Sequence, residues 1–392
     1  MVCGETKAVI SVDYPLYSSP LKLQVNEAKR CMYPLRLDAY GSGCDHHCSY
    51  CYARAQMIVG GWNNSRNPKH PFPRVADINC LRQMLTQMPE KKPACVSGSW
   101  KQIRPLLLNK LPLRLGAVTD CFQRYMESRT HTGLELLRIL TEARYPAQIV
   151  TKSDLIADDE YIEAMRENKD NLLIQLSITT AYDSVSRHLE PGAPLSSLRM
   201  QALGRLMDEG FFTAGRINPL FPIYPDATLS SLSARTGLRG VALLQNARRL
   251  DSPTLPIFDL KLVNDLLKIF KRAPRSTIGR HTLLAGFVRL PFATLKWVSQ
   301  AINWQREMLK SFFHISKGNC YYYSPEEIRH YYEAMKELCT NAGVPFSVCY
   351  DSDDNYEIFR DLWADPKDCC NALGNVPGFK KVHMDCYQRT TS

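Results

Sequence analysis

The 392-residue sequence has no apolar run approaching the ~20 residues that a membrane-spanning helix needs. Its first residues lack the basic stretch followed by an apolar segment that marks a secretory signal. These two absences predict a cytoplasmic protein without a membrane partner. Internal repeats and low-complexity segments are also absent from the sequence. With 45% hydrophobic residues, the chain can bury a sizeable core.

Cysteine and positive charge, by contrast, are plentiful. Fourteen cysteines in a chain without an export signal are expected to be thiols and metal ligands, because reducing compartments do not sustain disulfides. The net charge of +10 favours a polyanionic partner such as nucleic acid. A merely basic soluble enzyme would have the same charge, so both interpretations stay open.

Apolar periodicity predicts an α/β fold. Strand-like runs at residues 113–118, 147–150, 172–178 and 214–217 alternate with helix-like stretches at residues 133–142, 158–167 and 198–209. This alternation is typical of a parallel sheet covered by helices, either open or closed into a barrel. Chemistry in such folds takes place at the carboxyl ends of the strands, so the polar residues that follow each run are candidates for the site.

Three regions are expected along the chain. Residues 1–34 form an N-terminal lead-in, and residues 35–230 form the catalytic core. Residues 231–392 form a basic, mostly helical region with a last helix at 325–341, a strand at 345–350 and a cysteine-bearing tail.

The segment GCDHHCSYCYAR at residues 43–54 places Cys44, Cys48 and Cys51 at spacings of four and three. Thiolates are the preferred ligands of iron–sulfur clusters, and three of them leave one iron of a 4Fe–4S cluster open to a substrate. A zinc site with His46 or His47 as the fourth ligand is the alternative, although their position inside the loop is unlike the usual finger spacing.

This cysteine pattern, with an aromatic residue before the last thiol, resembles the radical S-adenosylmethionine superfamily, and in particular its spore photoproduct lyase and DNA repair photolyase branch. Further stretches of the same kind follow in the expected order: GAVTD at 116–120, VTKS at 150–153, SITT at 177–180, LEP at 189–191 and NPLFP at 218–222. The resemblance implies a partial (β/α)6 barrel of the TIM kind with a mostly helical C-terminal extension.

The resemblance also implies a set of cofactor contacts. Thr119 and Lys152 should reach the methionyl end of S-adenosylmethionine, and Lys152 suits its carboxylate as a compact cation. Tyr50 can pack beside the adenine. The residues expected to bind S-adenosylmethionine are Tyr50, Thr119, Asp120, Lys152, Ser177, Thr179 and Glu190. For each of them, a strand-end cap is the plain structural alternative.

The implied activity is reductive cleavage of S-adenosylmethionine to a 5′-deoxyadenosyl radical, which takes hydrogen from a substrate, with electrons from a donor such as flavodoxin or ferredoxin. Spore photoproduct lyase uses a cysteine as hydrogen donor just before the segment that matches Thr119. That place falls near Ala117 here, and the nearest thiol is Cys121. Cys121 is therefore one candidate catalytic residue, and Tyr52 is the other because a tyrosine can relay a radical. The missing cysteine near Ala117 is a departure from the lyase pattern.

A thymine-type base in DNA, or a nucleotide, is the leading substrate, undergoing base modification, isomerisation or lyase chemistry. The basic residues after 260 and the loop at 62–70, where an aromatic side chain alternates with cations, support this choice. An alternative is a peptide- or small-molecule-modifying enzyme with an auxiliary iron–sulfur cluster. Its ligands would come from the tail cysteines, which are Cys320, Cys339, Cys349, Cys369, Cys370 and Cys386. A second alternative is a non-enzymatic, metal-stabilised nucleic-acid-binding protein.

Overall fold

The computed structural model describes residues 21–25, 33–41, 43–53, 74–220, 260–301, 310, 313, 315–349 and 357–379. The loop at 62–70 and Cys386 lie outside these residues. Among the helices that are described, none is both long and apolar enough to cross a membrane.

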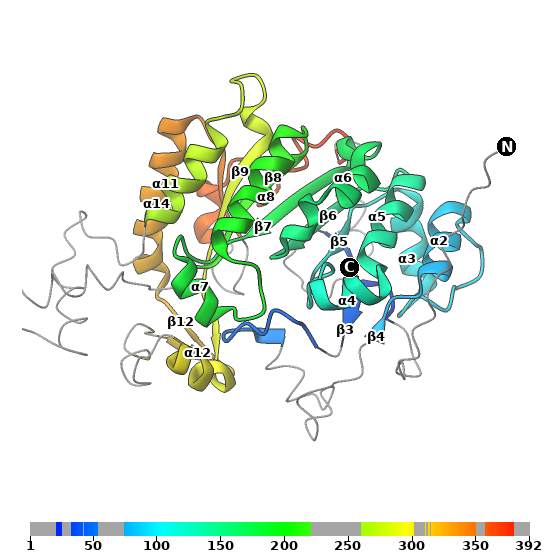
Figure 1. Ribbon diagram of the computed structural model, residues 1–392, viewed down its shortest axis with the longest axis horizontal. Helices are drawn as coiled ribbons and strands as arrows, with labels where there is room; N and C mark the ends of the chain where they lie inside the picture. The colour runs from blue at the N-terminus through cyan, green and yellow to red at the C-terminus, as the bar shows by residue number, and fades with distance from the viewer. Residues whose placement is uncertain are drawn as a thin grey trace, which may run out of the picture.

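One eight-stranded sheet forms the centre of the molecule (Figure 1). Its order is β1 (Gln24–Val25), β2 (Leu35–Leu37), β5 (Leu113–Leu115), β6 (Ala147–Thr151), β7 (Leu172–Ser177), β8 (Phe212–Leu220), β9 (His281–Phe287) and β13 (Phe346–Val348). The strands from β2 to β13 are parallel to one another, and β1 is antiparallel to β2. The fold is therefore a partial barrel of βα units, as predicted.

Helices connect the parallel strands. They are α2 (Ile78–Gln87), α3 (Trp100–Leu108), α4 (Arg124–Thr130), α5 (Thr132–Glu142), α6 (Asp159–Arg166), α7 (Asp183–Leu189), α8 (Ser196–Asp208), α11 (Leu260–Phe270), α12 (Leu295–Ala301) and α14 (Pro325–Ala342). Two small antiparallel sheets accompany them: β3 (Tyr40–Gly41) with β4 (Arg74–Val75), and β10 (Leu290–Pro291) with β12 (Cys320–Tyr322) and β11 (Ile315–Lys317).

The strands and helices expected from periodicity are present, with two differences of extent. β5 ends at Leu115 because Gly116 has a φ of +75°, and a Cβ there would lie 2.1 Å from the Val150 carbonyl oxygen. In addition, β9 and β13 continue the parallel sheet beyond residue 230. The sheet therefore spans the expected boundary between the core and the C-terminal region.

The two faces of the sheet differ in chemistry. Leu35, Leu113 and Ala147 are neighbours in register and are buried on one face, which α5, α6 and α8 cover (Figure 1). Strand register places polar side chains on the opposite face, which we call the inner face. These inner-face residues are Arg36, Arg114, Gln148, Gln175, Arg216 and Thr282.

The C-terminal segment, residues 357–379, packs against the inner face. Figure 1 shows it in orange to red on the side of the sheet away from α5, α6 and α8. Gln148 Nε2 donates to Cys370 Sγ at 3.0 Å, and Asn371 Nδ2 donates to Thr282 Oγ1 at 3.0 Å. Tyr33, just before β2, donates its hydroxyl to Asp368 Oδ2 at 3.2 Å. Polar contacts of this one segment therefore extend across the sheet from β2 to β9.

Candidate active site

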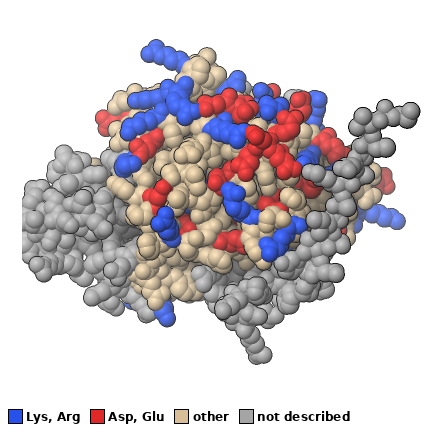
Figure 2. Space-filling model, viewed as in Figure 1, with Lys and Arg blue, Asp and Glu red and all other residues tan. Residues whose placement is uncertain are grey.

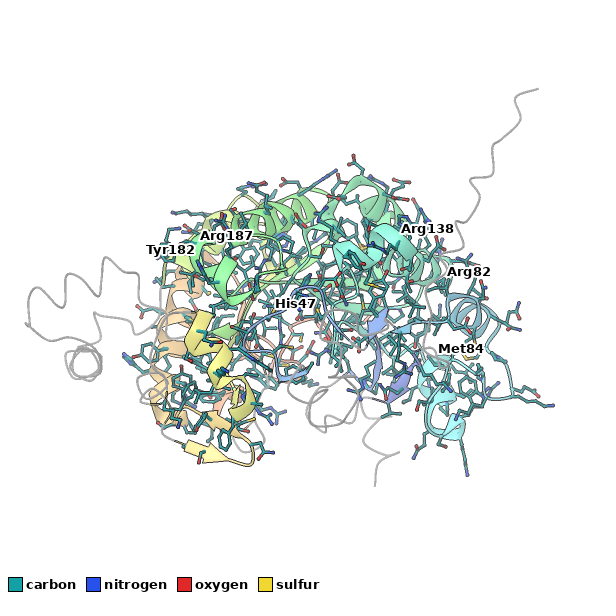
Figure 3. The ribbon with its side chains drawn as sticks, turned by 60° about the horizontal axis from the view of Figure 1, so that its bottom comes forward. His47, Arg82, Met84, Arg138, Tyr182 and Arg187 are labelled. Atoms are coloured by element: carbon teal, nitrogen blue, oxygen red, sulfur yellow. The ribbon has the colours of Figure 1, made fainter. Side chains whose placement is uncertain are left out.

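The three cysteines of the predicted cluster lie on the loop formed by residues 43–53, which follows β2 and β3 at the carboxyl ends of the parallel strands. In Figure 3, His47 of this loop lies in the middle of the face, with Tyr182 and Arg187 at α7 on one side and Arg82 of α2 and Arg138 of α5 on the other. The loop therefore occupies the edge at which a parallel α/β fold binds its ligands.

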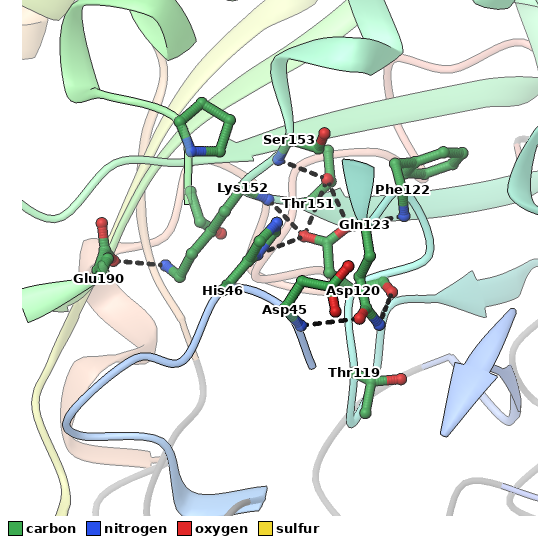
Figure 4. Close-up of polar contacts among 12 residues, drawn as sticks. Asp45, His46, Thr119, Asp120, Phe122, Gln123, Thr151, Lys152, Ser153 and Glu190 are labelled. Carbon is green, nitrogen blue, oxygen red and sulfur yellow. Dashed lines mark hydrogen bonds and ion pairs between the residues drawn. The ribbon is translucent and has the colours of Figure 1, made fainter. Parts of the chain in front are cut away.

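Asp120 fixes the loop to the segments after β5 and β6 (Figure 4). Its carboxylate accepts hydrogen bonds from Thr151 Oγ1 at 2.8 Å and from the Lys152 backbone N–H at 2.7 Å. His46 Nδ1 lies 3.5 Å from the same carboxylate. Burial lowers the pKa of His46, although Asp120 opposes that effect. Asp120, one of the residues expected to bind the cofactor, thus holds the segments after β5 and β6 against the cysteine loop.

The segment after α7 holds the loop from the other side. The Ser49 N–H donates to the Leu189 carbonyl at 2.8 Å, and the Gly192 N–H donates to the His46 carbonyl at 3.1 Å. A Cβ at position 192 would lie 1.7 Å from the Asp45 carbonyl oxygen. Only glycine fits this close approach of two backbones, so the sequence LEPG is matched to the cysteine loop.

The three thiols are suited to a cluster better than to a single ion. Cys44 and Cys48 have raised pKa values because of burial, and that of Cys48 reaches about 12. Sulfurs bound to one zinc lie only ~3.8 Å apart. Within the described part of the chain, the only group of ligand atoms all within 4.8 Å of one another is Asp368, Cys369 and Cys370. The three loop thiols thus do not all lie within 4.8 Å of one another, a spacing that the separate irons of a cluster would accommodate.

A buried carboxylate brings four of the predicted cofactor-binding residues together. Glu190, with no exposed side-chain surface, accepts hydrogen bonds from the Tyr50 hydroxyl and from Thr179 Oγ1, the latter at 2.6 Å. Lys152 Nζ lies 3.1 Å from Glu190 Oε1 (Figure 4). The Lys152 ammonium is also 5.7 Å from the centre of the Tyr50 ring. An anion, a cation and an aromatic ring thus meet beside the cysteine loop.

Arg199, on α8, is a site residue that sequence reasoning missed. It forms a fully buried ion pair with Glu190, and its NH1 donates to the Ser177 carbonyl at 2.9 Å. Burial alone would favour neutral Glu190, but Arg199 and then Lys152 outweigh it and lower the pKa of Glu190. Its position in the sequence could have indicated burial, because Arg199 lies three residues before Ala202 and four before Leu203 and so shares the apolar face of a predicted helix.

The other residues predicted to bind the cofactor or to act in catalysis make hydrogen bonds with groups other than Glu190. Thr119 donates its hydroxyl to the Tyr40 carbonyl, and Ser177 offers its carbonyl to Arg199. Cys121 is fully buried, and its sulfur accepts the Ala39 N–H at 3.2 Å, so the thiol is directed toward the end of β2. Tyr52 is 47% exposed and donates its hydroxyl to the Ala117 carbonyl at 2.5 Å.

The tail cysteines are distributed over separate elements. Cys320 lies in β12, Cys339 in α14 and Cys349 just after β13, whereas Cys369 and Cys370 lie in the C-terminal segment. Both carboxylate oxygens of Asp368 accept hydrogen bonds, including those from the Cys370 N–H at 2.9 Å and the Ala372 N–H at 2.7 Å. This carboxylate therefore orders the loop around the two thiols.

Three cations of the basic region pair with acidic side chains. Lys261 and Lys268 both pair with Asp265 on α11, and Arg272 pairs with Asp208 on α8. Figure 2 shows both signs of charge intermixed over this face of the molecule. Such exposed pairs are typical of a solvated helix surface.

No family model matches the sequence. An uncharacterized protein, ORF301, from Acidianus two-tailed virus is 23% identical over 183 residues, which are 47% of this chain and 55% of that protein. The chain thus matches little more than half the length of this curated relative.

Two solved structures of spore photoproduct lyase resemble the whole fold. A cysteine-to-serine variant has a TM-score of 0.54 at 14% identity and covers 85% of this chain and 80% of its own. A double variant with bound S-adenosylmethionine and dinucleoside spore photoproduct has a TM-score of 0.50 at 17% identity, covering 84% and 81%. The chain therefore has the partial-barrel fold of the radical S-adenosylmethionine enzymes, in the form seen in spore photoproduct lyase.

Proposed function

We propose that the chain is a radical S-adenosylmethionine enzyme that binds a 4Fe–4S cluster through Cys44, Cys48 and Cys51. The observation that carries the proposal is the position of the Lys152–Glu190 pair. It lies beside the cysteine loop at the carboxyl ends of β6 and β7, where this fold presents its ligands. When bound, the cluster and S-adenosylmethionine supply a 5′-deoxyadenosyl radical that can take hydrogen from a substrate.

The charges at this site suit an amino acid. The Lys152 ammonium can pair with a carboxylate, and the Glu190 carboxylate can pair with an ammonium group. Tyr50 and Thr179, both hydrogen-bonded to Glu190, keep its carboxylate oriented. Arg199 keeps that carboxylate ionised inside the protein. Together these residues would hold the methionyl end of S-adenosylmethionine against the cysteine loop.

The substrate that we propose is a thymine-type base in DNA or in a nucleotide. The net charge of +10 favours a polyanionic partner such as nucleic acid. A spore photoproduct lyase of the same fold holds a dinucleoside lesion. The reducing electron would come from a ferredoxin or flavodoxin.

The decisive experiment is anaerobic reconstitution of the wild type and of a Cys44→Ala, Cys48→Ala, Cys51→Ala variant. Iron and sulfide are quantified, and 5′-deoxyadenosine is assayed after addition of S-adenosylmethionine and dithionite. We expect cluster and product in the wild type and neither in the variant. A wild type that binds no iron and forms no 5′-deoxyadenosine would contradict the proposal.

The substrate class is tested with DNA whose thymidines carry deuterium on the base and not on the sugar. Deuterium that appears in 5′-deoxyadenosine shows that hydrogen is taken from the base. An unlabelled peptide library and unlabelled DNA serve as controls. If 5′-deoxyadenosine forms without deuterium in the presence of the labelled DNA, the thymine-type substrate is wrong, although the reaction class stands.

A further inference from the structure

The turn between the first two cysteines of the loop lies at the surface. His47 is exposed, whereas His46 and Cys48 on either side of it are buried. The His47 N–H donates to the Cys44 carbonyl at 3.3 Å, and the φ of His47 is +46°, so the backbone turns tightly here. Two of the three thiols proposed to hold the cluster thus flank a turn that is open to solvent.

Helices α4 and α7 border this turn. On one side, the Asp45 N–H donates to Gln123 Oε1, at the start of α4, at 2.8 Å. On the other side, the Gly192 N–H, just after α7, donates to the His46 carbonyl at 3.1 Å. These contacts join three segments into one surface at the cysteine loop. We call this surface the loop rim, and it consists of residues 43–53, 124–131 and 183–192.

The exposed charged side chains of the loop rim are basic, namely Arg124 and Arg187. Its acidic side chains are withdrawn from the surface: Asp45 and Asp183 are half-buried, and Glu127 and Glu190 are buried. Figure 3 shows Arg187 at one side of this face and Arg82 and Arg138 at the other. Arg82 and Arg138 both pair with Glu135, so the charges on that side are mixed. The loop rim therefore presents positive charge next to the cysteine loop.

Both exposed arginines can bind a further anion. The NH2 group of Arg124 donates to Asp154 Oδ1 at 2.8 Å, yet 62% of the Arg124 side chain is exposed. Arg187 forms no ion pair within the part of the chain that the structure describes. Nearby on α4, Arg129 stacks on Tyr125, which is 46% exposed. Arginine and tyrosine are enriched at protein–protein interfaces, so the loop rim has the composition of a docking surface.

An electron carrier must dock where the cluster lies nearest to the surface, because electron transfer slows steeply with distance. Ferredoxins and flavodoxins are acidic proteins, so a basic surface complements them. Such transient complexes bury less than about 1,200 Å² and need few charges. A DNA-binding surface commonly makes about 6–10 phosphate contacts. The loop rim has no lysine, and its arginines are Arg124, Arg129 and Arg187, so its charge fits a carrier better than DNA.

We propose that the loop rim docks the acidic electron carrier of this enzyme and that Arg124 and Arg187 steer its approach. The inference rests on the proposed radical function, and it names the surface at which the ferredoxin or flavodoxin binds. One electron leaves the reduced carrier and enters the cluster held by the cysteine loop. The carrier is oxidised and the cluster reduced by that electron, and no bond is made or broken.

The test compares two full-length variants that lose the same amount of charge. Arg124→Gln/Arg187→Glu alters the loop rim, with glutamine at the first position because a glutamate there would repel Asp154. Lys271→Gln/Arg275→Glu alters two exposed cations between α11 and β9. Because this connection leads into β9, it lies at the amino-terminal edge of the parallel sheet, away from the loop rim. Iron content and Tm verify that both variants fold.

The first readout needs no turnover. Isothermal titration calorimetry measures the Kd of oxidised flavodoxin for each reconstituted protein at low and at physiological ionic strength. We expect the Kd at low ionic strength to rise severalfold in the loop-rim variant and to change much less in the other variant. This difference should shrink as salt screens the charges. The second readout is the ratio of 5′-deoxyadenosine formed with reduced flavodoxin to that formed with dithionite, which should fall severalfold only in the loop-rim variant.

An equal change of Kd in the two variants would overturn the inference, because net charge rather than the loop rim would then govern binding. So would a wild type that binds neither flavodoxin nor ferredoxin. A DNA duplex that displaces flavodoxin from the wild type would assign the loop rim to nucleic acid and would also overturn it. A wild type that forms no 5′-deoxyadenosine with dithionite instead contradicts the proposed function, and the Kd values distinguish that outcome from a failure of the docking surface.

Discussion

The guanidinium of Arg199 and the carboxylate of Glu190 form an ion pair in which neither side chain has any exposed surface. The pair joins α8 to the segment that holds the cysteine loop, and Lys152 contacts the same carboxylate from the end of β6. If this site binds the cofactor as proposed, stability and cofactor binding would be coupled through one buried anion.

Replacing Arg199 by Met should destabilise the fold strongly, because Glu190 would remain buried with one of its two cations removed. Breaking such a pair typically lowers the free energy of unfolding by about 3–5 kcal/mol. Urea unfolding of the metal-free protein measures this change in the free energy of unfolding. Arg205→Ala is the matched control on the same helix, since its pair with Asp159 is exposed and should contribute less than about 1 kcal/mol. Equal losses in the two variants would contradict the role of the buried pair.

Gly192→Ala should prevent the cysteine loop from reaching its cluster-binding shape. The added Cβ would meet the Asp45 carbonyl at 1.7 Å, and a backbone contact of that kind cannot be relieved by a side-chain rotation. We expect iron content after reconstitution to fall severalfold. Gly279→Ala is the control, because a Cβ there has nothing within 4 Å. Full iron content in Gly192→Ala would show that the loop does not depend on this contact.

Lys152→Met should weaken S-adenosylmethionine binding and leave the cluster in place. A hydrogen bond to a charged group contributes about 1.5–3 kcal/mol, so the Kd should rise by roughly tenfold or more. Equilibrium dialysis with labelled S-adenosylmethionine gives the Kd, and visible absorbance reports the cluster. Lys101→Met, on the exposed surface of α3, should change neither quantity. An unchanged Kd in Lys152→Met would remove Lys152 from the cofactor site.

Stability should decrease in mild acid because of His281. Burial lowers the pKa of this histidine to about 4; its ring bonds Thr213 and stacks on Phe270. The unfolded chain takes up the proton near pH 6.5, so the contribution is complete above that pH and is lost as the pH falls toward 4. The loss amounts to about 3 kcal/mol.

Chemical denaturation between pH 7 and pH 4 measures this dependence. His281→Gln does not titrate, so its stability should change less over the same range. An identical pH dependence in the variant and the wild type would assign the effect to other groups.

The sequence predicted those features that depend on local pattern. The alternation of apolar runs indicated the parallel sheet, and the resemblance to the radical S-adenosylmethionine superfamily indicated Lys152, Thr179 and Glu190, which the structure brings together. Arg199 was missed because its burial depends on where α8 packs. The contact of Cys370 with Gln148 joins residues 222 positions apart, and no local pattern encodes such a distance. For the same reason, the sequence analysis assigned the residues of β9 and β13 to the C-terminal region, although both strands belong to the central sheet.

The hydrogen bond between Tyr33 and Asp368 spans 335 positions of the chain. During synthesis, the strands from β2 to β9 leave the ribosome well before the segment that covers their inner face exists. Contacts between residues so far apart in the sequence form late, and they lower the rate of folding. Until residues 357–379 have been made, the carboxamides of Gln148 and Gln175 lack their cover, so the inner face of the sheet is buried only when the last described segment of the chain packs against it.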